Sequence, residues 1–170
     1  LIALLVVAII LIADQWLKFW VKGGMYLGQE KFIIGRWFLF HFTENNGMAF
    51  GLELGGMKGK LFLTIFRIVA VFGILYYLIL QIKKGSKLGL VICVSLVLAG
   101  AMGNIIDSVF YGVWFKDNYN DYLPDGTLRW PHHAPYFYGR VVDMLYFPVI
   151  EGRYPDWFPF WGGESFLFFR

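Results

Sequence analysis

The 170-residue sequence contains few charged residues. Fifteen Lys and Arg and twelve Asp and Glu make up 16% of the chain, against about 25% in a typical soluble domain. The net charge is only +3 on a sequence that is 58% hydrophobic, which argues against a soluble nucleic-acid-binding protein. High hydrophobicity with low net charge also excludes intrinsic disorder. The composition therefore indicates a membrane protein, and no nucleic-acid partner is expected.

Cysteine and the common catalytic signatures are also nearly absent. The single cysteine, Cys93, excludes a disulfide framework, and its apolar neighbours predict a packed residue at mid-membrane. There is no Gly-x-Ser-x-Gly elbow, no phosphate-binding loop and no Gly-x-Gly-Asp sequence. His132 and His133 are adjacent, and no Cys or carboxylate completes a familiar ligand spacing, so no metal site is predicted.

Three long apolar stretches are present instead. Leu61 to Gln81 and Leu88 to Tyr111 contain one charge each, and a hydrocarbon core of ~30 Å requires about 20 helical residues. They predict transmembrane helices over residues 60–82 and 88–111. Residues 1–21 also reach spanning length. Because this stretch lacks a basic leading region and an Ala-x-Ala-like site, it predicts a first transmembrane helix rather than a signal peptide.

The positions of the lysines orient these helices. Three lysines between residues 83 and 87 occupy the short loop that joins the second and third helices, and positive charge in a short loop marks the cytoplasmic side. Residues 22–59 are therefore predicted to lie on the extracytoplasmic side of the membrane. The same holds for residues 112–140 and 141–170, which follow the third helix.

The predicted external segments differ in composition. Phe32 to Thr43 is aromatic and β-branched, which favours a strand, and Glu44 to Gly47 is typical of a turn. We expect a small extracytoplasmic sheet packed over the helices. Tyr111 to Arg140 predicts an ordered insertion. The alternation of aromatic residues with Pro and Gly in Pro148 to Arg170 is typical of a segment on the bilayer surface.

Ionisable residues at membrane depth are costly, and they are candidates for function. Asp14 and Lys18 are four residues apart on the first helix, so they can form an ion pair with a structural or a functional role. Arg67 in the second helix can pair with a carboxylate or snorkel to the outer surface, and snorkelling is the favoured interpretation.

The third helix and the segment after it carry the densest polar signal. Gly100, Gly103, Asn104 and Asp107 fall on one helical face, where the glycines allow close packing and the polar side chains point into the bundle. Asp143 has apolar, β-prone neighbours, which raise the proton affinity of an unpaired carboxylate. Two facing carboxylates can share one proton, as in aspartyl proteolysis and in proton relays. Helix packing is the alternative role of the polar face.

Four motifs in this order resemble the lipoprotein signal peptidase family, prolipoprotein signal peptidase II. They are Asp14-Gln15-x-x-Lys18, Asn45-x-Gly47-x-Ala49-Phe50, Gly100-Ala101-Met102-Gly103-Asn104-Ile105-Ile106-Asp107 and Val141-Val142-Asp143. The resemblance covers nearly the whole chain outside the insertion and the tail. It departs at Ser108 and Met144, where the family usually has Arg and Phe.

The resemblance implies a multi-pass aspartyl endopeptidase of the bacterial inner membrane. Such an enzyme removes signal peptides from diacylglyceryl-modified prolipoproteins by cleaving before the lipidated cysteine. Asp143 is the implied catalytic residue, at an active site on the extracytoplasmic side, and its partner Asp is expected beyond Arg170. The implied residues that bind substrate or support the site are Asp14, Lys18, Asn45, Gly47, Asn104 and Asp107.

The implied fold is a membrane protein, mainly α, with a helical bundle and a small extracytoplasmic β-cradle. Four spans are usual in the family, and three are predicted within the single domain of residues 1–170. We expect no metal or organic cofactor, and a monomer that contacts membrane lipids and the lipid-modified substrate. The alternative is a catalytically inactive, membrane-anchored lipopeptide-binding protein that lacks the second Asp. A proton-coupled transporter lacks the support of an inverted repeat.

Overall fold

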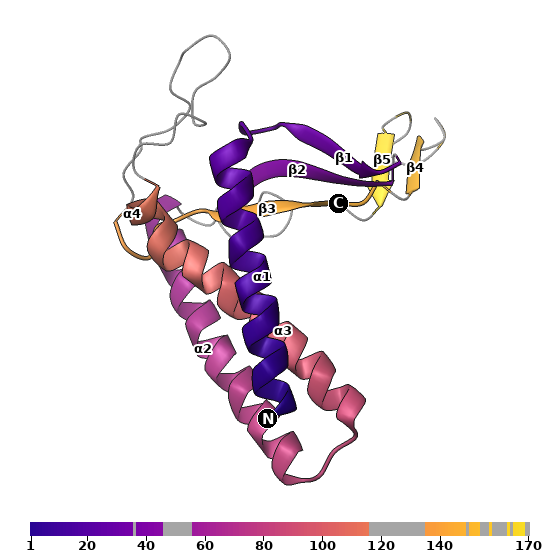
Figure 1. The fold of residues 1–170 in the computed structure, drawn as a ribbon. Helices are drawn as coiled ribbons and strands as arrows, with labels where there is room; N and C mark the ends of the chain where they lie inside the picture. The colour runs from indigo at the N-terminus through magenta and orange to yellow at the C-terminus, as the bar shows by residue number, and fades with distance from the viewer. Residues whose placement is uncertain are drawn as a thin grey trace.

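The computed structural model places three long helices beneath a small antiparallel sheet (Figure 1). It describes residues 1–35, 37–45, 56–115, 135–148, 150–153, 157, 163 and 165–168. Helix α1 is Ile2–Gly24, α2 is Gly56–Lys83 and α3 is Leu88–Ile106. Within the described residues, three helices are long and apolar enough to cross a membrane. The predicted helical membrane fold is therefore confirmed.

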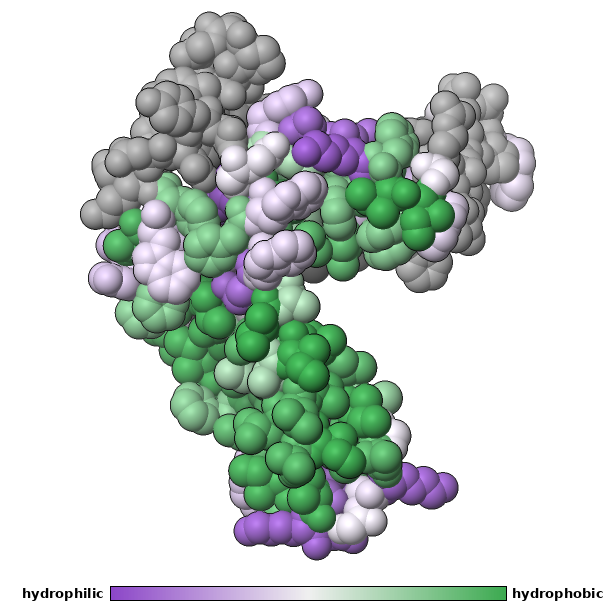
Figure 2. Space-filling view, in the orientation of Figure 1, coloured by the Kyte–Doolittle hydropathy of each residue, from purple (hydrophilic) through white to green (hydrophobic). Residues whose placement is uncertain are grey.

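The helices are apolar on most of their surface because they face lipid rather than water. Phe62, Phe72 and Tyr76 of α2 are each about two-thirds exposed, at 65%, 66% and 65%. Figure 2 shows hydrophobic side chains covering the helices between the polar α2–α3 turn and the mixed surface at the opposite end. The turn itself uses Gly85 at φ +67°, a left-handed conformation that glycine adopts without steric cost.

Helix α3 packs against both α1 and α2. Its direction continues past Ile106 through a π-helical turn, η2 (Asp107–Tyr111), and a short helix, α4 (Gly112–Trp114). Two apolar clusters hold the bundle together. The deeper cluster contains Ala3, Leu78, Val91 and Leu98 from the three helices, and the outer cluster contains Val21, Met25, Phe42, Tyr111, Val142 and Met144. The outer cluster joins the helices to the sheet.

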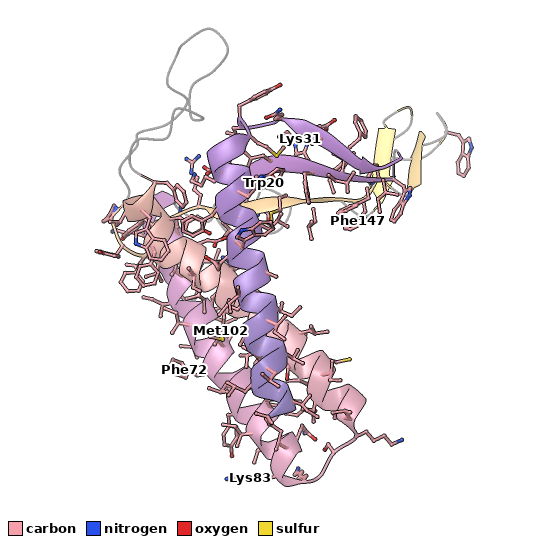
Figure 3. The ribbon with its side chains drawn as sticks, viewed as in Figure 1. Trp20, Lys31, Phe72, Lys83, Met102 and Phe147 are labelled. Atoms are coloured by element: carbon pink, nitrogen blue, oxygen red, sulfur yellow. The ribbon has the colours of Figure 1, made fainter. Side chains whose placement is uncertain are left out.

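The main sheet has the order β1-β2-β3 and is antiparallel. Its strands are β1 (Glu30–Ile34), β2 (Phe38–Asn45) and β3 (Val141–Tyr146). The β2–β3 pairing sets Thr43 opposite Asp143, so it joins segments 100 positions apart in the chain. Lys31 of β1 lies over the ring of Trp20 of α1, with Nζ 5.0 Å from the centroid (Figure 3). This contact ties the edge of the sheet to the helix below it.

The strand predicted over residues 32–43 is wrong in its bounds. The structure has two strands there, because the chain reverses near Gly35, which has φ +54°. Glu44 and Asn45, which were expected in a turn, instead extend β2, because Asn45 pairs with Val141 of β3. The rest of that expected turn, Asn46 and Gly47, lies outside the described residues.

The segments after the third helix are described only in part. Residues 116–134, most of the predicted insertion, lie outside the described residues, as does much of the aromatic tail. Within the tail the structure has two paired antiparallel strands, β4 (Ile150–Arg153) and β5 (Ser165–Phe168). This hairpin was not predicted from the sequence, because its aromatic residues and glycines have no clear alternation.

An apolar groove lies between α2 and α3, deeper along the helices than the polar residues. Its lining includes Gly73 and Tyr77 of α2 and Cys93 and Val97 of α3. Cys93 is exposed in this groove, so the expectation that it is a packed residue is wrong. Helix α3 directs its buried face, with Val91 and Ser95, away from this position.

Candidate active site

Lys18 is the centre of a buried ionic cluster between α1 and α3. Its Nζ lies 2.7 Å from Asp107 Oδ2 and 3.1 Å from Asp14 Oδ2, and it donates to Asn104 Oδ1 at 3.3 Å. The Lys18 side chain is 3% exposed and Asp107 is fully buried. An ion pair taken out of water survives only with close geometry and further hydrogen bonds. The predicted Asp14–Lys18 pair is therefore confirmed as part of a larger cluster.

Gly103 makes this close approach of α1 and α3 possible. A Cβ atom at position 103 would lie 2.4 Å from Asp14 Oδ2 and 3.7 Å from Lys18 Nζ. The prediction that a glycine allows close packing is confirmed here. It is wrong for Gly100, where a Cβ would have no heavy atom within 4 Å. The difference arises because Gly100 is exposed and Gly103 faces α1.

Gln15 completes the coordination of the buried carboxylate. Its Nε2 donates to Asp107 Oδ1 at 3.2 Å and to Asp14 Oδ2 at 3.1 Å, and its Oε1 accepts a hydrogen bond from the Tyr111 hydroxyl at 3.1 Å. From the sequence, Gln15 was predicted only as part of a motif, without a role, and Tyr111 was missed. The sequence signal for Gln15 was its position directly after Asp14 and three residues before Lys18, which puts it close to both on the helix.

Asp107 also fixes the start of β3. The backbone N–H of Val142 donates to Asp107 Oδ2 at 3.2 Å. At the next two residues of η2, Gly139 N donates to the Ser108 carbonyl at 2.8 Å and Phe137 N donates to the Val109 carbonyl at 3.2 Å. A π-helical turn changes the regular helical hydrogen-bonding pattern, and here the chain before β3 binds two of its carbonyls. The π-helical turn η2 therefore supports the start of β3, the strand that carries Asp143.

Asp143 points away from the apolar core. Val142 and Met144 on either side of it are buried, whereas Asp143 is exposed, as expected from the alternation of side chains along a strand. Asn45 Nδ2 donates a hydrogen bond to Asp143 Oδ2, and Thr43 Oγ1 donates to the Asp143 carbonyl at 3.4 Å. The two residues of β2 therefore orient the Asp143 carboxylate and its backbone.

The protein surroundings raise the pKa of the Asp143 carboxyl above its ordinary value. The main cause is desolvation by neighbouring protein atoms, which acts even though the side chain retains contact with solvent. Three groups oppose it and lower the pKa: the charge of Lys18, the hydrogen bond from Asn45 and the charge of Arg67. A carboxyl with a raised pKa can exchange a proton with water nearer neutral pH, which suits acid–base chemistry.

Arg67 does not follow the favoured expectation of snorkelling to the surface. Its Nη1 donates to Ser108 Oγ at 3.4 Å, so the guanidinium lies between α2 and η2. It attracts the carboxylates of Asp107 and Asp143 electrostatically. One turn earlier on α2, Thr64 Oγ1 donates to the Phe137 carbonyl at 3.1 Å, which links α2 to the segment before β3.

A second buried ion pair joins α1 to β2. Lys22 Nζ binds Glu44 Oε1, and the two side chains are each 7% exposed. The ammonium also lies 5.2 Å from the ring centroid of Phe115 and 5.9 Å from that of Phe42. This pair was missed from the sequence, because Lys22 and Glu44 have no local spacing that relates them.

The structure thus divides the predicted site residues between two places. Asp14, Lys18, Asn104 and Asp107 form the buried cluster, and Asn45 joins Asp143 on the sheet. Gly47, His132 and His133 lie outside the described residues. In the part of the chain that the structure describes, no three His, Cys, Asp or Glu side chains are grouped as metal ligands.

The chain is similar in sequence to members of a known protein family. The profile of the family described as signal peptidase (SPase) II matches residues 6–166. A lipoprotein signal peptidase from Porphyromonas gingivalis is 48% identical over 169 residues, which is 96% of this chain and 71% of that protein. A lipoprotein signal peptidase from Amoebophilus asiaticus is 42% identical over 172 residues, which is 95% of this chain and 64% of that protein.

Solved structures give a matching fold. A bacterial membrane enzyme determined by the in meso method superposes with a TM-score of 0.60 at 22% identity, over 96% of this chain and 76% of that chain. A second bacterial membrane enzyme structure superposes with a TM-score of 0.58 at 24% identity, over 86% of this chain and 74% of that chain. At these identities the similarity concerns the fold alone.

Proposed function

The chain belongs to the signal peptidase II family, and on this premise we propose that it is an aspartyl endopeptidase that cleaves diacylglyceryl-modified prolipoproteins before the lipidated cysteine. Family membership supports a membrane protease that removes signal peptides from prolipoproteins. The aspartic class, the catalytic residue and the position of the cut are the finer parts of the proposal.

The position of Asp143 is the observation that carries this proposal. Its carboxylate lies on the exposed face of β3, and Asn45 binds one of its oxygens. Strand β3 lies near the end of the helical bundle opposite the α2–α3 turn (Figure 1). As a general base it takes a proton from a water molecule, whose oxygen then attacks the scissile carbonyl carbon. A second carboxyl, protonated, gives its proton to the departing amide nitrogen. We propose that this second Asp lies in the sequence that follows Arg170.

Asp107 is less suited to act as the second carboxyl. Its Oδ2 accepts from Lys18 and from the Val142 N–H, its Oδ1 accepts from Gln15, and the side chain is fully buried. A carboxylate with its oxygens bound in this way has no direct path to water or substrate. We assign to it, and to Asp14, Lys18 and Asn104, the role of holding α1, α3 and β3 in register.

The charge distribution supports a site on the extracytoplasmic side of the inner membrane. Lys83 is at the end of α2 that is farthest from the sheet (Figure 3), in the same short turn as Lys84 and Lys87. A basic turn marks the cytoplasmic side, so Asp143 is on the outer side. A substrate with a lipid anchor approaches Asp143 from within the bilayer. A monomeric enzyme surrounded by lipid leaves this lateral approach open.

The test is cleavage of a diacylglyceryl prolipoprotein by the purified full-length protein, followed by gel shift. We expect Asp143→Asn to abolish turnover while the melting temperature shows a folded protein. The matched control is Glu30→Gln on β1, an exposed carboxylate paired with His41 in the same sheet, which should retain wild-type turnover. Retained turnover by Asp143→Asn would contradict the catalytic assignment. Substrate binding without turnover by the wild type would favour an inactive lipopeptide-binding protein.

A further inference from the structure

Helix α2 supplies a cation to the π-helical turn η2, which contacts the segment before β3. Arg67 is more than two turns inside α2, and its guanidinium reaches across to Ser108 on η2. Ser108 is 3% exposed and directly follows the fully buried Asp107. This contact fixes the guanidinium at the end of α3 on which β3 is seated.

Lys18 cannot orient Asp143 by hydrogen bonding. An ammonium group has three N–H donors. Those of Lys18 are engaged by Asp107 at 2.7 Å, Asp14 at 3.1 Å and Asn104 at 3.3 Å. Lys18 therefore acts on Asp143 through its charge alone, and it is held in place by other partners.

Arg67 has a different donor geometry. A guanidinium has five N–H donors in a rigid planar fork, and it stays charged at any physiological pH. Ser108 Oγ accepts from Nη1, and the guanidinium also attracts Asp143. A side chain with these properties can be anchored by one partner and still act on a second.

Several charged groups on the elements packed against β3 are bound to partners of their own. The pairs are Asp107 with Lys18, Glu44 with Lys22, and His41 with Glu30. Among the described residues, Lys18 and Arg67 are the cations whose charges favour the ionised form of Asp143. Lys18 is on α1, whereas Arg67 comes from α2.

We propose, resting on the proposed function, that Arg67 is a positioning residue of the cleavage site: anchored on Ser108, its guanidinium holds the Asp143 carboxylate in the ionised form that activates water. Arg67 acts through Asp143 and needs no contact with the substrate. Its removal should therefore lower the fraction of enzyme in the active protonation state and leave substrate affinity nearly unchanged.

The test is the pH dependence of prolipoprotein cleavage by the full-length protein and its Arg67→Met and Arg67→Lys variants. An ionised base is required, so kcat rises with pH through the titration of Asp143. Without the cation this acid limb should move to higher pH, while KM changes less than about twofold. Arg67→Lys should keep most of the wild-type profile. Lys83→Met, which removes a charge at the far end of α2, is the matched control and should leave the limb unchanged.

The outcomes distinguish failure of the proposed function from failure of the proposed role of Arg67. An inactive wild type contradicts the proposed function, whereas an active wild type with an unshifted limb in folded Arg67→Met overturns the role of Arg67 alone. If Arg67→Met does not fold, Ser108→Ala replaces it, because this change removes the anchor and keeps both charges. A lower kcat with a shifted limb in Ser108→Ala then supports the proposal, and a wild-type profile overturns it.

Discussion

Gly103 is the residue at which a single added methyl group tests the packing of α1 on α3. A Cβ there would lie 2.4 Å from Asp14 Oδ2, so Gly103→Ala forces the carboxylate away from Lys18. We expect a loss of about 1–3 kcal/mol in the free energy of unfolding, as in other overpacked interiors. Thermal unfolding in detergent measures this. Gly100→Ala is the matched control, since open space surrounds that position. Equal stability of the two variants would contradict the close approach.

Asp143 makes a testable contribution to the pH dependence of stability. Desolvation raises the pKa of its carboxyl, so the folded protein binds this proton more tightly than the unfolded chain does. The resulting stability is present below the ordinary pKa of about 3.9 and is lost as pH rises through the raised pKa. Asp143→Asn does not titrate. The melting temperature of this variant minus that of the wild type should therefore increase between about pH 4 and pH 7. A constant difference would contradict the raised pKa.

At the scale of elements, the seat of β3 on η2 depends on Gly139. A Cβ at this position would lie 2.2 Å from the Asp107 carbonyl oxygen and 2.9 Å from Gly112 N, and backbone atoms cannot move aside cheaply. Gly139→Ala should displace the start of β3 and reduce cleavage by at least about tenfold through misplacement of Asp143. Gly24→Ala at the end of α1, with nothing within 4 Å, is the control. Full activity of Gly139→Ala would show that the strand tolerates a shift.

Local patterns were sufficient to predict some elements and not others. Long apolar runs with few charges define the helices, and helical periodicity alone was enough to place Asn104 and Asp107 on one face. The pairing of Asn45 with Asp143 depends on the register of β2 with β3, and the pairing of Lys22 with Glu44 depends on the position of β2 relative to α1. That register joins segments far apart in the chain, and no local spacing encodes it. The π-helical turn has no sequence signature either, and its hydrogen bonds with residues 137–139 again join segments far apart in the chain.

Local sequence patterns do not predict the different environments of Asp107 and Asp143. From charge and depth alone, Asp107 and Asp143 could be two carboxylates that share one proton, and only the family resemblance made Asp143 catalytic and Asp107 a supporting residue. The structure separates them by environment: Asp107 is fully buried with Lys18, whereas Asp143 is on the exposed face of a strand. Only the three-dimensional arrangement shows which carboxylate can meet water.

At the scale of the whole molecule, the turn of lysines and the sheet should lie on opposite sides of the membrane. Cys93 is the single cysteine, so a Cys93→Ala background allows one cysteine to be placed at either end. In intact cells with a permeable outer membrane, Glu30→Cys should react with a membrane-impermeant maleimide and Lys84→Cys should react only after lysis. Labelling of both positions, or of Lys84→Cys alone, in unlysed cells would contradict the proposed orientation.

The most direct test of the central claim is mass spectrometry of the products formed from a diacylglyceryl prolipoprotein in ¹⁸O-labelled water. We expect a mature lipoprotein that begins at the lipidated cysteine, together with a signal peptide that carries one ¹⁸O in its new carboxyl group. Both products should be absent with Asp143→Asn and present with Glu30→Gln. Cleavage at another bond would contradict the proposed cleavage position, and unchanged product formation by Asp143→Asn would contradict the catalytic role of Asp143.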